Sequence, residues 1–290
     1  MSTDNRTPGN VTTGNVTTDK PPAPGPLAVA GPWDLVSAGY AAESISIMLP
    51  FSQRAIDLAQ PAAGAQVLDV ATGPGVLALE LAPRVARVDA VDFAPAMLAE
   101  LEQRRQARGI ENVFAQVADG QALPFADASF DAAFSMFGLM FFPDRRRGFA
   151  ELYRTLKPGG VAVVSSWAPV EQSPLMILMF GALRAADPTR AAPQTNLLNL
   201  ENPEVFVREL EQAGFRDVRV EPHTHSMEVR DPAAWWESLV RGGAPMALLK
   251  QRLGPAEWER QSQLAKDYLA EQLSAPRTLS TTAYLGFGRR

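Results

Sequence analysis

The chain contains no cysteine and only two histidines among its 290 residues. Without cysteine it has no disulfide framework, no thiolate metal ligand and no cysteine nucleophile, which fits a reducing compartment. No segment has the roughly eighteen uninterrupted apolar residues that a membrane span needs. The polar stretch at residues 2–20 also lacks the apolar core of a signal peptide. We therefore expect a cytoplasmic protein.

Positive charge is scarce as well, because 27 lysines and arginines stand against 32 aspartates and glutamates, a net charge of −5. Binding to a nucleic-acid backbone requires a basic face. The short arginine run at residues 145–147 is more typical of a solvated helix start. We expect a small-molecule partner and no nucleic acid, and a protein that is a monomer or a homodimer.

The first residues differ in composition from the rest. Residues 1–26 are rich in Thr, Asn, Gly and Pro and contain almost nothing that a core could bury, which predicts a disordered tail. Residues 27–290 are long enough for one large domain, and a chain that is 46% hydrophobic can form a substantial core.

From residue 64 onward, short apolar runs alternate with longer helical stretches. We predict strands at 65–70, 85–91, 112–117, 130–134 and 161–166, with helices at 75–81, 95–108 and 146–156. This alternation is typical of an α/β fold with a doubly wound, mostly parallel sheet. Two further strands are predicted at 215–221 and 278–287, and helical cap insertions at about 168–200 and 231–275.

A glycine-rich turn follows the first predicted strand, in the segment DVATGPGVL at residues 69–77. Gly73 and Gly75 allow a positive φ and leave room for a ligand to approach the backbone. The amides of the helix that begins here point toward whatever lies at the turn. A turn of this kind is equally typical of a tight strand–helix connection with no ligand.

Three aspartates follow three consecutive strands. Asp69, Asp92 and Asp119 each lie at the carboxyl end of a predicted strand, and ligands bind at that edge in open α/β sheets. Each aspartate alone is compatible with a helix cap or a turn. Three in register favour a ligand site, in which Asp92 accepts hydrogen bonds from a ribose and Asp119 from an adenine amino group.

A nicotinamide-dependent oxidoreductase is the alternative for this site. Residues 73–78 formally satisfy the G-x-G-x-x-G/A pattern, and Asp92 lies near the expected distance from it. However, Asp69 intervenes before a longer turn, and the rest of the chain offers no evident site of hydride transfer.

Four segments together resemble the successive motifs of class I S-adenosylmethionine-dependent methyltransferases: VLDVATGPGVLALEL, VDAVDFAPAML, QVADGQALPFADASFDAAFSMFGLMFF and LKPGGVAVVSSW. The most similar branch contains the ubiquinone/menaquinone biosynthesis methyltransferases, and the resemblance covers residues 33–167 well. It implies a Rossmann-like seven-stranded sheet whose last strand is antiparallel, with a helical cap, and S-adenosylmethionine as the cofactor. The sequence departs from the quinone-biosynthesis signatures further downstream, so the acceptor does not follow from it.

The resemblance also implies positions for the cofactor. The glycine turn would lie under the methionine part and the ribose of S-adenosylmethionine. Asp92 would bind the ribose, and Asp119 would contact the adenine. By position, the implied cofactor-binding residues are Tyr40, Asp69, Ala71, Thr72, Gly73, Gly75, Asp92, Phe93, Met97, Asp119, Gly120, Gln121, Ser135, Met136 and Phe137.

The acceptor side is less defined. His223 and His225 alternate on one strand face and are candidate catalytic bases. We favour the alternative that they belong to an exposed polar segment with no catalytic role. No metal site is expected, because no clear third ligand accompanies the pair. Methionines and aromatic residues at 136–142, 176–180 and 235–236 form either core or an apolar acceptor pocket.

Two functional hypotheses follow. The first is a methyltransferase that acts on a small, apolar or aromatic acceptor by O- or C-methylation. The second is an S-adenosylmethionine-binding protein that does not methylate and serves as a cyclase or a regulator.

Overall fold

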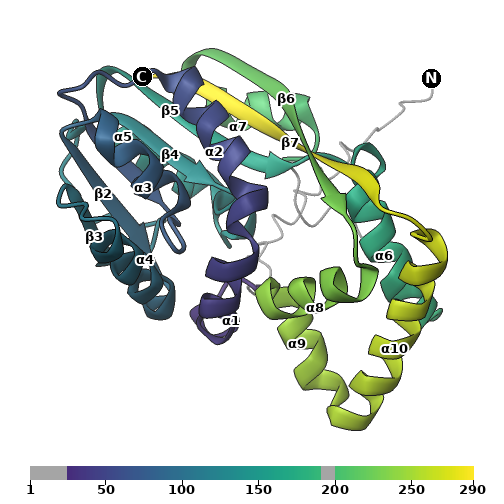
Figure 1. The fold of residues 1–290 in the computed structure, drawn as a ribbon. Helices are drawn as coiled ribbons and strands as arrows, with labels where there is room; N and C mark the ends of the chain where they lie inside the picture. The colour runs from purple at the N-terminus through teal and green to yellow at the C-terminus, as the bar shows by residue number, and fades with distance from the viewer. Residues whose placement is uncertain (1–24, 191–199) are drawn as a thin grey trace, which may run out of the picture.

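The computed structural model describes residues 25–190 and 200–290. They contain one seven-stranded sheet with helices on both faces (Figure 1). The strands are β1 (Gln66–Val70), β2 (Arg87–Asp92), β3 (Val113–Val117), β4 (Phe130–Met136), β5 (Leu156–Trp167), β6 (Arg216–Val229) and β7 (Arg277–Arg289). Their order in the sheet is β3-β2-β1-β4-β5-β7-β6. Strands β1 to β5 pair in parallel, whereas β7 is antiparallel to β5 and β6. The predicted fold class is therefore confirmed.

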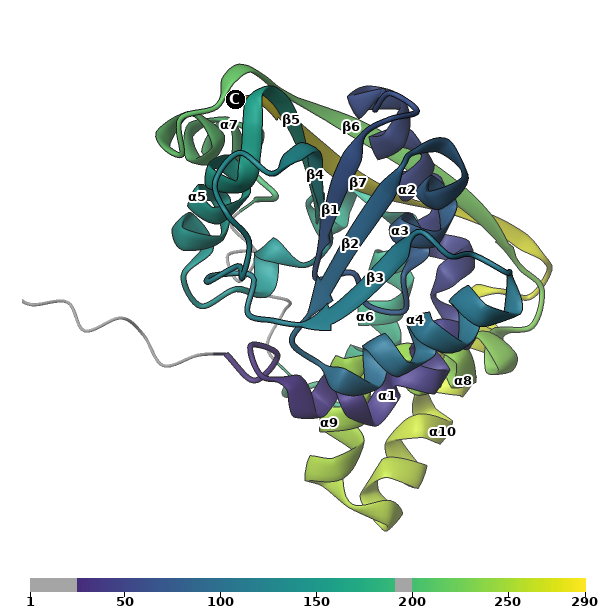
Figure 2. The same ribbon diagram turned by 90° about the vertical axis from the view of Figure 1, so that its left-hand side faces the viewer.

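Helices cover the two faces of the sheet in separate layers (Figure 2). One face carries α2 (Ile45–Ala59), α3 (Val76–Leu81) and α4 (Pro95–Ala107), and the other carries α5 (Arg145–Thr155) and α7 (Pro203–Gln212). Neighbouring residues of β1 serve the two layers: Val67 is buried with Phe51, and Leu68 with Leu152. Each such side chain contributes about 1.5–3 kcal/mol when fully buried.

A second group of helices lies beyond the far end of β6 and β7 (Figure 1). It consists of α6 (Pro174–Ala186), α8 (Pro232–Gly242), α9 (Ala244–Leu253) and α10 (Pro255–Gln272). These helices share a core of their own, in which the rings of Trp236 and Trp258 stack at 6.2 Å. They fall within the two ranges predicted for cap insertions. That division of the chain stays a prediction, and residues 1–24 of the predicted tail lie outside the described residues.

Helix α1 (Ala30–Glu43) connects this cap to the sheet. It packs against α8 and α9 of the cap and against α4 beside the sheet. Asp34 anchors it, because its Oδ1 accepts a hydrogen bond of 2.9 Å from the amide of Ala96 at the start of α4. In the part of the chain that the structure describes, no helix combines the length and apolar character needed to cross a membrane.

Two element boundaries differ from the sequence prediction by more than two residues. Residues 157–160, which lie between the predicted helix at 146–156 and the predicted strand at 161–166, belong to β5, because Gly159 donates to the carbonyl of Arg290 and Arg290 donates to that of Gly160, both at 2.8 Å. Strand β6 ends at Val229 and not at residue 221, because its pairing with β7 continues to the end. Both differences come from backbone pairing with the C-terminal strand, which lies far away in sequence.

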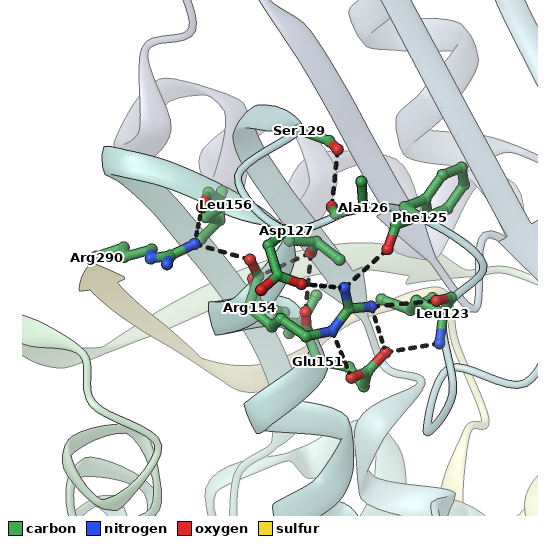
Figure 3. Close-up of polar contacts among 11 residues, drawn as sticks. Leu123, Phe125, Ala126, Asp127, Ser129, Glu151, Arg154, Leu156 and Arg290 are labelled. Atoms are coloured by element: carbon green, nitrogen blue, oxygen red, sulfur yellow. Dashed lines mark hydrogen bonds and ion pairs between the residues drawn. The ribbon is translucent and has the colours of Figure 1, made fainter.

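The connection between β3 and β4 is held by Arg154 of α5 (Figure 3). Its guanidinium donates to the carbonyls of Leu123 and Phe125 at 3.1 and 2.8 Å and to the carboxylates of Asp127 and Glu151 at 2.7 and 2.8 Å. Charged hydrogen bonds of this kind are stronger than neutral ones. Arg154 therefore fixes the connection whose first residues, 118–121, lie at the sheet edge described next.

Candidate active site

A cavity of about 460 Å³ lies at the carboxyl ends of the parallel strands, within the size range of small-molecule sites. One half is lined by the turns that follow β1, β2 and β3, and the other by α6, α8 and the end of β7. Helix α1 contributes residues to both halves. The cavity therefore joins the sheet edge where a ligand is expected to the cap.

The glycine turn between β1 and α3 borders the first half. Ala71, Gly73 and Gly75 all have positive φ values, of 57°, 55° and 75°. A Cβ atom added to Gly73 would meet nothing within 4 Å, so its backbone is open to a ligand. Ala71 has the same left-handed conformation with a side chain present, which costs about 1–2 kcal/mol. Such strain at a turn is characteristic of functional sites.

Asp92 ties this turn to the end of β2. Its Oδ2 accepts from the amide of Gly73 at 2.8 Å, and its Oδ1 from the amide of Ala94 at 2.9 Å. The side chain lines the main cavity and is only 6% exposed. Burial raises its pKa, and the two amides partly oppose that shift. A carboxylate with lone pairs left on both oxygens can accept further hydrogen bonds from a ligand.

Asp69 is the more deeply buried acid, at 1% exposure. Its Oδ2 accepts from the Thr72 hydroxyl at 2.7 Å, and both residues line a smaller cavity of about 40 Å³ beside the main one. Burial raises the pKa of Asp69 to about 7, and the nearby charge of Asp92 adds to the shift. Two buried acids at one turn favour a ligand group that carries positive charge.

The third acid lies at the end of β3. Asp119 is exposed, and its Oδ1 accepts from the amide of Gln121 at 2.8 Å. Gln121 in turn accepts from the amide of Asp144 at 2.8 Å, which fixes its side chain at the cavity wall. A Cβ on Gly120 would lie 2.5 Å from the ring of Phe142. Glycine here is therefore required by the packing of an aromatic residue that also lines the cavity.

Aromatic residues of α1 and of the segment after β4 close this half. The ring of Trp33 contacts that of Phe141 at 5.2 Å, edge to face. Tyr40 lines both cavities, and burial, with a contribution from Asp92, raises its pKa to about 12. The Tyr40 hydroxyl therefore keeps its proton at neutral pH and acts as a donor.

Most of the sequence-predicted cofactor residues come together here. The main cavity is lined by Tyr40, Ala71, Gly73, Asp92, Phe93, Met97, Asp119, Gly120, Gln121, Met136 and Phe137, and the smaller one by Asp69 and Thr72. Their contact with a cofactor stays a prediction.

Gly75 and Ser135 line neither cavity. Gly75 instead allows close packing, since a Cβ there would lie 2.7 Å from the side chain of Leu101. Ser135 is fully buried. The nearby amide of Phe137 donates to the hydroxyl of Ser165 and not to that of Ser135. The cavity geometry thus does not support a direct contact of these two residues with a cofactor, and their predicted role stays a prediction.

The two histidines also lie outside both linings. They pack edge to face on Phe51 of α2, with ring centroids at 5.5 Å for His223 and 6.5 Å for His225. Both histidines are half-buried, whereas Thr224 between them is exposed. Burial and the charge of Arg54 lower the pKa of His223. A catalytic role of either histidine stays a prediction, and neither side chain lines a cavity.

The cap half of the cavity is apolar. Met176 and Met179 of α6 and Trp235 of α8 line it, as the sequence suggested, whereas Trp236 is buried in the cap core. The sequence analysis missed Trp33, Met48, Trp167 and Thr281. A signal exists for Trp167, because it ends the strand parallel to β4, but Thr281 comes from a strand that gave no sign of bordering a ligand.

Comparisons with known proteins agree with this geometry. Residues 67–160 match the family model described as "Methyltransferase domain". The chain is 46% identical over 123 residues to the demethylmenaquinone methyltransferase of Thermus thermophilus, covering 42% of this chain and 56% of the relative. It is 38% identical over 128 residues to an uncharacterised protein of Mycobacterium tuberculosis, covering 44% and 46%. The crystal structure of the [4+2]-cyclase SpnF aligns with a TM-score of 0.58 and 20% identity, covering 92% of this chain and 97% of that one, which shows the fold alone.

These matches confirm the predicted class. Residues 67–160 match a methyltransferase domain, and the relatives that align over this part of the chain include demethylmenaquinone methyltransferases. S-adenosylmethionine is the cofactor of the class that the sequence resembles. This assignment takes the place of the nicotinamide alternative. The chain spans only about half the length of the curated relatives it matches.

Proposed function

We propose that the protein transfers the methyl group of S-adenosylmethionine to an oxygen or carbon atom of a small aromatic, quinone-like acceptor. One observation carries this proposal: a single cavity joins the glycine turn and Asp92 to an apolar wall built by the cap. The match to demethylmenaquinone methyltransferases supports the acceptor class.

The residues present fit the cofactor. Gly73 leaves its backbone open, Asp92 offers a carboxylate for ribose hydroxyls, and the wall at Asp119 and Gly120 suits the adenine. The positive sulfonium and ammonium groups match the buried acids Asp69 and Asp92. When bound, S-adenosylmethionine supplies an electrophilic methyl carbon on a sulfur that is a good leaving group.

The protein's contribution is to position the acceptor and exclude water. With the cofactor bound, an electron pair of the acceptor, a lone pair on oxygen or a π pair on a ring carbon, would form the new bond to the methyl carbon. The electron pair of the broken bond would stay on sulfur, and the proton lost by the acceptor would pass to water. Among the described residues of the cavity wall, no carboxylate or imidazole in the cap half is free to act as a base. Glu43 accepts from Arg241 at 2.7 Å, and Tyr40 keeps its own proton. An acceptor that ionises by itself in water, such as a phenol or hydroquinone, fits this site.

The test combines binding and transfer. Calorimetry should detect S-adenosylmethionine binding, and labelled cofactor should transfer its methyl group to members of a panel of phenols, quinones and hydroquinones. No binding at millimolar cofactor would overturn the proposal. Binding without transfer to any acceptor would instead favour the non-methylating alternative, a cyclase or a regulator.

The cellular setting is proposed on sequence grounds. A net charge of −5 and the lack of cysteine support a cytoplasmic protein, a monomer or homodimer, that acts on a small molecule and not on nucleic acid.

A further inference from the structure

Two pairs of adjacent residues in the cap differ in how their polar atoms are satisfied. In α8, Trp236 donates from Nε1 to the Ser262 hydroxyl at 2.7 Å. In β7, Thr282 donates from Oγ1 to the carbonyl of Gln172 at 3.0 Å. Both residues line neither cavity. Within each pair, the second member is thus a buried polar residue with a partner inside the protein.

The adjacent residues Trp235 and Thr281 differ from Trp236 and Thr282 both in their place at the cavity and in their hydrogen bonding. Trp235 and Thr281 are 6% and 2% exposed, and both line the main cavity. Trp235 Nε1 and Thr281 Oγ1 have no hydrogen-bond partner. Adjacent residues of a strand point to opposite faces of the sheet, which explains why Thr281 meets the cavity and Thr282 does not.

Buried polar atoms without a partner are costly, because they lose hydrogen bonds to water and gain none in return. Of the buried side-chain atoms without a partner in the described residues, those of Trp235 and Thr281 belong to residues that line the main cavity, whereas Ser52, Ser135 and Arg190 do not line it. The surrounding wall carries the apolar side chains of Leu175, Met176 and Leu239, with Glu43, Ser44 and Ser238 as its other polar residues. Among the polar residues that line this half, Trp235 and Thr281 are the two with a buried side-chain atom that has no partner.

We propose that Trp235 and Thr281 bind an oxygen atom of the methyl acceptor and so set its specificity. The indole N–H only donates hydrogen bonds, and the threonine hydroxyl can donate as well, so the matching group is a carbonyl, ether or phenolate oxygen. Both atoms are buried in residues that line the cavity, and rotation of Thr281 about χ1 exchanges its methyl group for its hydroxyl. The inference rests on the proposed function, in which this half of the cavity holds the acceptor.

The chemistry of the wall defines the class of acceptor. A largely apolar wall with two unpartnered donors selects a flat, mostly hydrocarbon ring system that carries at least one oxygen. A site that provides hydrogen bonds to a polar group discriminates strongly against an analogue without that group, because the donors would stay unpaired. Aromatic ketones, quinones and phenols are therefore accepted, and plain aromatic hydrocarbons of the same shape are rejected.

Two probes of matched shape test this inference. Calorimetry or equilibrium dialysis compares naphthoquinone with naphthalene on the full chain saturated with S-adenosylhomocysteine. The wild-type protein is expected to bind naphthoquinone about tenfold more tightly, the size of one to two net hydrogen bonds. Trp235→Phe and Thr281→Val should each reduce this preference severalfold. The matched controls Trp236→Phe and Thr282→Val should leave it unchanged.

Thermal unfolding provides an independent check. Thr281→Val replaces an unpartnered buried hydroxyl by a methyl group of the same shape and should raise the Tm, whereas Thr282→Val breaks a hydrogen bond and should lower it. The inference is overturned if Thr281→Val lowers the Tm as Thr282→Val does, or if the preference for naphthoquinone survives in both cavity variants.

These outcomes are distinct from a failure of the proposed function. A wild-type protein that binds the cofactor but shows no preference for naphthoquinone over naphthalene would refute the roles of Trp235 and Thr281 alone. A retained preference in a protein that binds no S-adenosylmethionine would refute methyl transfer and leave a site for an oxygenated aromatic ligand.

Discussion

The buried acid at the glycine turn makes stability depend on pH with an unusual sign. Burial raises the pKa of Asp69 to about 7 from an ordinary value of 3.8. The folded protein therefore holds a proton that the unfolded chain has already released between these two values. A proton bound only in the folded state stabilises it, so this contribution is complete below about pH 4 and is lost as the pH rises to about 7.

The size of the effect follows from linkage. Between about pH 5 and pH 6.5 the group is protonated when folded and ionised when unfolded, so stability falls by close to 1.4 kcal/mol for each pH unit. Wild-type protein should lose about 2 kcal/mol over this interval through Asp69. In Asp69→Asn this loss disappears, because the amide does not titrate, while its oxygen can still accept from Thr72.

Urea unfolding at a series of pH values gives the free energy of unfolding for both proteins. The difference between wild type and variant isolates the contribution of Asp69, because the other titrating groups are present in both proteins. His223 is one of them: its pKa is lowered, so its contribution to stability has the opposite sign and is lost as the pH falls. Glu102→Gln is the control: the Arg105 hydrogen bond lowers the pKa of Glu102 to about 2, so its effect is confined to lower pH. Parallel curves for wild type and Asp69→Asn would show that Asp69 is ionised in the folded protein and refute the reasoning.

Three further predictions concern the cavity and its turn. Asp92→Ala should weaken S-adenosylmethionine binding by about 1.5–3 kcal/mol in calorimetry if the carboxylate holds the ribose; unchanged affinity would remove that role. Gly138→Ala should lower the free energy of unfolding in urea by about 1–3 kcal/mol, because its Cβ would lie 2.3 Å from that of Ala71. Adding Ala71→Gly should restore part of this loss. If the effects of the two substitutions on the free energy of unfolding simply added, the contact would be contradicted. Gly39→Ala should lower both the Tm and the cofactor affinity, because its Cβ would lie 2.1 Å from the carbonyl of Arg241 and push α1 from α8; a normal Tm would show that the helices separate freely.

The cofactor half of the site could be predicted from sequence because its residues follow strands directly. Once β1, β2 and β3 are parallel, their carboxyl ends share one edge, so Asp69, Asp92 and Asp119 are brought to that edge by local sequence alone. The exceptions have physical reasons. Gly75 and Ser135 occupy motif positions, but their surroundings are decided by packing against Leu101 and by the order of the sheet, which a motif does not contain.

The acceptor half could not be predicted in this way, because tertiary contacts assemble it. Thr281 reaches the cavity only because β7 is inserted antiparallel between β5 and β6, and an alternation of polar residues does not say which face borders a ligand. The histidines show the same limit. They alternate along β6, but the pairing of β6 with β7 and their packing on Phe51 place them outside the lining of both cavities.

Ala71 shows how two parts of the cavity wall depend on each other. Its left-handed backbone is strained with a side chain present, and a glycine would adopt it more easily. Its Cβ fills the space opposite Gly138, in the segment that continues into Met140 and Phe141 of the cavity wall. The strained turn after β1 therefore packs directly against the segment that follows β4. A change on either side must shift the other, so this one contact positions two parts of the cavity wall together.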